Sequence, residues 1–180
     1  MRAYRAKDMA DSKADLLAGA GGLVTDEAQS DHQGRKALLL VRNNEDCDEF
    51  IALAKTMGIN IVDRVDQRGR SDAKWFLGQG KLQDVNEELR STSHGHPWND
   101  VDLLLLHTNA TPRQLVGVND AVGIEVWDRV RLLLALFTAH ASSVEARTQV
   151  RIARLQSDRT VLREVVKQQT TGERAGYGGA

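Results

Sequence analysis

Four consecutive residues, Gly78-Gln79-Gly80-Lys81, are the stretch whose residue types best suit ligand chemistry. Glycines let a ligand approach the backbone, a predicted helix start offers free N–H groups, and Lys81 adds a positive charge. Gly78, Gly80 and Lys81 are therefore candidate contacts for a nucleotide or another anion. The stretch lacks the Walker spacing and the third glycine of a dinucleotide loop, so a purely structural turn is the favoured interpretation.

The rest of the sequence predicts no catalytic residue and no metal ligand. No Walker motif occurs, so we expect no GTP hydrolysis by the usual P-loop route. The five histidines are scattered, without a cysteine or carboxylate at ligand spacing, and the single cysteine, Cys47, is expected to be unreactive. His107 has more interest because it ends a predicted strand, where ligand crevices form in α/β sheets. A hydrogen bond to backbone remains its favoured role.

Positive charge is concentrated toward the C-terminus. Residues 129–180 carry nine basic and four acidic side chains, a net charge of +5, against −2 for residues 1–34 and −4 for residues 35–128. Basic segments gain affinity for polyanions by releasing counterions from phosphates. Arg147, Arg151 and Arg154 share one face of a predicted helix, although a solvated charged face is an open alternative.

Four short apolar runs alternate with three amphipathic patterns in the middle of the chain. The expected strands are residues 36–42, 59–65, 101–107 and 124–127. Thr111 and Pro112 predict a helix start, and Gly58 and Gly123 predict helix ends. This alternation predicts an α/β domain over residues 35–128: a small four-stranded, mostly parallel sheet with flanking helices.

A single long helix is predicted over residues 129–171, because neither Pro nor Gly occurs between Arg129 and Gly172. At 1.5 Å per residue such a helix is about 60 Å long, so part of it must project from so small a domain. Its apolar stripe then needs a second helix, which makes it half of a helical hairpin. The stripe consists of Phe137, Ala141, Val144, Thr148, Ile152, Leu155, Leu162 and Val166.

The two ends of the chain show no sustained periodicity. Residues 1–34 are expected to be a mobile leader and residues 172–180 a flexible glycine-rich tail. The longest apolar runs are far shorter than the roughly 18 residues that span a bilayer, and the N-terminus lacks a signal-peptide core. We expect a cytoplasmic protein that does not enter the membrane.

Several motifs follow one another in a specific order and spacing. They are Ile61-Val-Asp-Arg-Val-Asp-Gln-Arg68, Phe76-Leu-Gly-Gln-Gly-Lys-Leu82, Thr111-Pro-Arg-Gln-Leu115, Gly123-Ile-Glu-Val-Trp-Asp-Arg129 and Gln149-Val-Arg-Ile-Ala-Arg-Leu155. Together they resemble the N-terminal region of the HflX family of ribosome-associated GTPases, over about residues 36–165. The sequence departs from the family at Ala141-Ser-Ser-Val144, where a basic stretch is usual, and the GTPase domain and returning hairpin helix are missing. Either a truncated form or a free-standing relative fits.

The resemblance implies an α/β subdomain, then a helical hairpin that reaches into the large ribosomal subunit during ribosome splitting or rescue. The leading hypothesis is a non-catalytic ribosome-binding module that acts in translation. Its expected ribosomal RNA contacts are Arg147, Arg151, Arg154, Arg163, Lys167 and Arg174. One alternative is an ATP- or GTP-binding protein that uses Gly78, Gly80 and Lys81, since ATP binding is ascribed to this region in some family members. Another is a partner whose long helix pairs with a second copy or regulates a full-length HflX-type GTPase.

Overall fold

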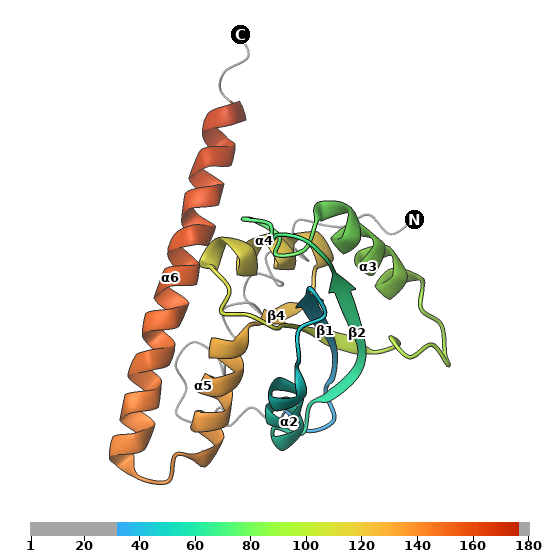
Figure 1. The fold of residues 1–180 in the computed structure, drawn as a ribbon. Coiled ribbons are helices and arrows are strands. Elements are labelled where there is room, and N and C mark those ends of the chain that lie inside the picture. The colour runs from blue at the N-terminus through green and yellow to red at the C-terminus, as the bar shows by residue number, and fades with distance from the viewer. Residues whose placement is uncertain (1–31, 177–180) are drawn as a thin grey trace.

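The computed structural model describes residues 32–176. Most of the predicted leader and the end of the predicted tail lie outside these residues. A four-stranded sheet forms the centre, with strands in the order β2-β1-β3-β4, all parallel (Figure 1). The strands are β1 (Lys36–Arg42), β2 (Asn60–Gln67), β3 (Val101–Leu106) and β4 (Glu125–Trp127). This confirms the predicted α/β fold with a small parallel sheet.

Five helices pack around this sheet. They are α2 (Asp48–Thr56), α3 (Gln79–Ser91), α4 (Pro112–Val122), α5 (Arg129–His140) and α6 (Val144–Gly176). The central strands β1 and β3 are apolar on both faces, so each face needs a helical cover. Leu38 and Leu104 face a core shared with α3, α4 and α6, while Leu39 and Leu105 face a core shared with α2 and α5.

The start and the end of α4 follow the predicted signals. The Thr111 hydroxyl accepts a hydrogen bond from the Gln114 N–H, and the Gln114 side chain accepts one from the Thr111 N–H. Pro112 occupies the first turn, and Gly123 ends the helix in the left-handed region at φ 79°.

The single helix predicted over residues 129–171 is wrong, because the chain reverses at residues 141–143. Helix α5 ends at His140, and the Ser143 hydroxyl caps α6 by accepting a hydrogen bond from the Ala146 N–H at 3.0 Å. A serine cap starts a new helix without any glycine or proline, which is why the sequence pattern missed the break. Figure 1 shows α5 and α6 running antiparallel beside each other, so the structure contains both arms of a short hairpin.

Helix α6 lies against α4 and α5 by one side only. Val161 and Val165 are buried there, and Asp158 is buried beside Arg131 of α5. The long C-terminal helix is confirmed, and Figure 1 shows its final turns projecting beyond α4. Six apolar members of the predicted stripe remain more than two-fifths exposed: Phe137 on α5, and Val144, Ile152, Leu155, Leu162 and Val166 on α6. In the described part of the chain, no helix is both long and apolar enough to cross a membrane.

Candidate functional site

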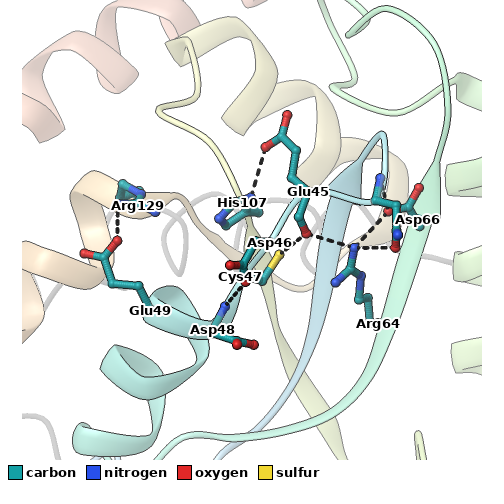
Figure 2. Close-up of polar contacts among 10 residues, drawn as sticks. Glu45, Asp46, Cys47, Asp48, Glu49, Arg64, Asp66, His107 and Arg129 are labelled. Atoms are coloured by element: carbon teal, nitrogen blue, oxygen red, sulfur yellow. Dashed lines mark hydrogen bonds and ion pairs between the residues drawn. The ribbon is translucent and has the colours of Figure 1, made fainter.

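The carboxyl ends of the strands meet where parallel α/β sheets form ligand crevices. Strand β2 lies on one side of β1 and β3 on the other, so the crossover direction changes between β1 and β3. The segment after β1, residues 43–47, and His107 after β3 come together there (Figure 2). This is the edge of the sheet at which the sequence placed His107.

His107 is held at this edge of the sheet by backbone and side-chain contacts. Its backbone N–H donates a hydrogen bond to the Leu40 carbonyl at 3.0 Å, which agrees with the favoured backbone role. Its Nδ1 lies 3.3 Å from Glu45 Oε2, and its ring meets Phe50 edge-on at a centroid distance of 5.4 Å. The side chain is only 10% exposed. His107 is thus packed between the Phe50 ring and the Glu45 carboxylate.

Several acidic side chains lie at this edge of the sheet. Asp46, Asp48 and Glu49 lie at the start of α2, and Asp46 accepts a hydrogen bond from the Asp48 N–H at 2.9 Å. Arg129 Nη1 contacts Glu49 at 3.5 Å, and its guanidinium lies 5.9 Å from the centre of the Phe50 ring. Carboxylates repel phosphates, so the α2 side of the sheet edge is unsuited to a nucleotide's phosphate groups.

Cys47 is an internal thiol at this edge. It is buried, its Sγ–H donates to the Glu45 carbonyl at 3.2 Å, and burial raises the pKa of the thiol. A raised pKa keeps the thiol protonated and weakly nucleophilic, as expected from the sequence. Arg64 bonds the Asn44 side chain at 3.0 Å and Asp66 at 3.2 Å, so β2 holds the turn after β1 in place.

The glycine stretch lies at the start of α3, where Gly78 is the N-cap. The Gly78 N–H already donates to Gln67 Oε1 at 2.6 Å, and a Cβ on Gly78 would lie 3.1 Å from Gln67 Nε2. The Gly78 N–H is thus already bound by a side chain of β2. A Cβ on Gly80 meets nothing within 4 Å, and Lys81 is partly exposed, so these two residues border open space.

The six predicted RNA contacts occupy more than one side of α6. Arg147, Arg151, Arg163 and Lys167 are exposed. Arg154 is half-buried, and burial lowers the pKa of its guanidinium, partly offset by the nearby Asp158 carboxylate. Arg174 belongs to α6 by its backbone, and its side chain is not among those that the structure describes. At 3.6 residues per turn, Arg163 and Lys167 fall on the side opposite Arg147 and Arg154.

Two groups of residues were missed in the sequence. One is the buried Arg131–Asp158 ion pair at 2.9 Å, which no local pattern announces because the partners lie on different helices. The other is the loop of residues 68–76, which carries Arg68, Arg70 and Lys74 against the single carboxylate of Asp72. Among the described residues, no three His, Cys, Asp or Glu side chains are placed to hold a metal ion.

The fold is that of the α/β N-terminal domain of a class of GTP-binding proteins. The family described as GTP-binding GTPase N-terminal matches residues 44–138, more than half of the chain, and the chain belongs to this family. Within the class its relatives are GTPases named HflX, in agreement with the resemblance of the motifs. The HflX of Hyperthermus butylicus is 30% identical over 129 residues, covering 72% of this chain and 33% of that protein. The HflX of Thermococcus kodakarensis is 28% identical over 131 residues, covering 73% and 28%.

Solved structures agree with this assignment. A crystal structure of a mutant of the protein named SsGBP matches with a TM-score of 0.60 and 25% identity, over 73% of this chain and 41% of that one. A GTP-binding protein from Sulfolobus solfataricus, in complex with GDP, shares the fold with a TM-score of 0.58 and 23% identity, over 78% and 42%. The chain spans about a third of the length of the curated HflX relatives.

Proposed function

We propose that this chain is the ribosome-docking part of an HflX-type GTPase, which binds RNA of the large subunit and acts in translation or ribosome rescue in the cytoplasm. The observation that carries the proposal is the placement of α6. One side of α6 holds it on α4 and α5, while four of the six predicted contacts, Arg147, Arg151, Arg163 and Lys167, are exposed. The membership of the chain in the HflX family supports the choice of partner.

The distribution of charge indicates how α6 engages RNA. Arg147 and Arg151 lie near its start, and Arg163 and Lys167 lie further along on another side. A helix with cations on several sides suits a cleft between RNA segments better than a single flat surface. Protein contacts to folded RNA are made mainly to the backbone and its shape, so no base-specific code is expected.

Cosedimentation with purified large subunits over a series of salt concentrations tests the proposal. We expect binding that weakens steeply with salt, and the variant Arg147→Gln/Arg151→Gln should lose affinity and reduce the salt slope by roughly 0.7–0.9 per lost contact. Lys55→Gln/Arg90→Gln removes two cations from the last turns of α2 and α3; it is the matched control and should behave as wild type. Folded wild-type protein that does not sediment with subunits even at low salt would contradict the proposal.

A nucleotide site at the start of α3 is the second candidate. It is favoured by the open space at Gly80 beside the partly exposed Lys81. Calorimetry with ATP and with GTP should then show heat for wild type and a clear loss for Lys81→Ala. Equal heats in both proteins would exclude this site.

A helix partner is the third candidate, because Ile152, Leu155, Leu162 and Val166 leave an apolar stripe exposed on α6. A second copy of this chain or a full-length HflX-type GTPase would supply the covering helix. Light scattering should show a complex whose mass depends on concentration, and Leu155→Asp should abolish it. A wild-type chain that stays monomeric alone and with that GTPase contradicts this candidate.

A further inference from the structure

The loop of residues 68–76, which connects β2 to α3, is strongly basic. Residues 68–81 carry four cations, Arg68, Arg70, Lys74 and Lys81, and one carboxylate, Asp72. The Asp72 carboxylate is bound by the backbone of its own loop: its Oδ1 accepts hydrogen bonds from the N–H groups of Lys74 at 2.6 Å and Trp75 at 2.8 Å. The loop therefore presents an excess of positive charge to solvent.

A further cation joins the loop from α4. Arg113 is exposed in the first turn of α4, close enough to Asp72 to lower the pKa of that carboxyl, with the Lys74 and Trp75 N–H groups as the main cause. Arg68 and Arg70 are exposed as well. The opposite charge dominates on the α2 side of the same sheet edge, so the carboxyl edge as a whole is polarised.

Hydrogen bonds from β1 and α4 fasten this loop to the body. The Arg70 carbonyl accepts from the buried Arg42 guanidinium, and the Gly69 N–H donates to Asn43 Oδ1 at 2.8 Å. Gln114 Nε2 donates to the Asp72 carbonyl at 2.7 Å and to Ser71 Oγ at 3.1 Å. The backbone that carries Arg68 and Arg70 is thus fixed before any ligand arrives.

Close packing on α4 fixes the second half of the loop. A Cβ on Gly117 would lie 2.2 Å from the Lys74 carbonyl oxygen, so only glycine lets the two backbones approach this closely. Phe76 is buried with φ 61°, a costly conformation for a bulky residue, and paired backbone hydrogen bonds with Asp72 hold it there. A rigid loop loses little conformational entropy on binding, which increases the affinity that each cation provides.

We infer that this basic loop, residues 68–76 together with Arg113 of α4, is a second RNA-binding surface that contacts backbone phosphates through Arg68, Arg70, Lys74 and Arg113. Arginine forks bind phosphate oxygens in pairs, and several cations on one fixed backbone match a repeating anionic chain better than a single carboxylate. The inference rests on the proposed function, because it places a second contact with the same RNA partner on the α/β body, apart from α6.

The test uses the full chain and compares two double variants of equal charge. Arg68→Gln/Arg70→Gln removes two cations of the basic loop, and Lys55→Gln/Arg90→Gln removes two from the last turns of α2 and α3. Binding to large subunits and to a free RNA duplex is measured from about 50 to 200 mM salt, after unfolding curves show that both variants are folded. Arg113→Gln serves as an independent single variant.

We expect the loop variant to bind both probes on the order of tenfold more weakly at low salt, with a salt slope smaller by roughly 0.7–0.9 per lost contact. The control variant should match wild type. Loop and control variants that bind equally well overturn the inference, whereas the proposed function stands if wild type still binds subunits. If wild type binds the duplex, the loop variant binds it more weakly and neither binds subunits, the RNA-binding role of the loop stands and the proposed function is wrong.

Two remaining outcomes also decide the inference. A wild type that binds neither probe at low salt refutes both the inference and the proposed function. Polyglutamate that competes with the RNA duplex at equal charge concentration would assign the basic loop to acidic protein segments, and the RNA inference would then be wrong.

Discussion

Buried charge holds α6 on the body of the protein. The side chains of Arg131 and Asp158 are 1% and 8% exposed, and Arg131 also follows Asp128, the N-cap of α5, by one helical turn. Asp128 accepts hydrogen bonds from the Arg131 N–H at 2.9 Å and the Ala110 N–H at 3.0 Å. One small network thus joins the end of β4, the start of α5 and the middle of α6.

Removing one member of the buried pair should be costly. Asp158→Ala leaves the Arg131 guanidinium buried without its carboxylate, so we expect the free energy of unfolding to fall by about 3–5 kcal/mol. The double variant Arg131→Met/Asp158→Leu should recover most of that loss because it buries no charge. Urea unfolding measures all three proteins, and a single variant within about 0.5 kcal/mol of wild type would contradict this role.

The carboxylate of Asp72 gives the basic loop a defined pH dependence. Hydrogen bonds from the Lys74 and Trp75 N–H groups lower the pKa of Asp72 in the folded state. The resulting stabilisation is complete above the unfolded value near 3.9 and is lost as pH falls through the folded value. The stability gap between wild type and Asp72→Ala should therefore narrow as the pH falls from about 5 through the folded pKa of Asp72. If the stability difference between the two proteins widened as the pH fell, the pKa of Asp72 would be raised in the folded state and this prediction would be wrong.

At the scale of elements, loop packing on α4 depends on one glycine. Alanine is normally the better helix former by about 1 kcal/mol, yet a Cβ on Gly117 meets a backbone oxygen that cannot move alone. We expect Gly117→Ala to destabilise the protein by about 1–2 kcal/mol net, and to weaken RNA binding by displacing the basic loop.

Gly80→Ala is the matched control for that change. Its Cβ enters open space in the first turn of α3, so stability should stay equal or rise by up to about 1 kcal/mol. Thermal and urea unfolding of both variants show whether each substitution raises or lowers the free energy of unfolding. A Gly117→Ala protein as stable as the Gly80→Ala protein would mean that the loop is not packed against α4 as described.

At the scale of the whole molecule, the orientation of α6 decides which residues remain for partners. Val161 is 1% exposed and Leu162 is 44% exposed, although the two are neighbours in sequence. Val161→Ala should cost about 1–2 kcal/mol of stability, while Leu162→Ala should change it by less than about 0.5 kcal/mol. Chemical unfolding of the pair tests the orientation, and the reverse order of effects would place the apolar stripe against the body.

Local signals were sufficient for the α/β body. The apolar run of β1 was predicted over the residues that it occupies, and the Thr111 cap and Gly123 stop placed α4 correctly. Strong short-range signals of this kind act within a few residues, so they are readable in the sequence. The same holds for His107, since a strand end at a crossover needs only the order of the elements.

Long-range contacts decided the rest. The stripe of Leu155 and Leu162 has helical period, but α6 docks instead by Val161, Val165 and the charged Asp158, because Arg131 on α5 supplies the matching cation. A buried ion pair is stable only when both partners are present, so neither residue reveals it alone. The basic loop likewise became a rigid surface only through Gln114 and Gly117 of α4, which approach it in space and not in sequence.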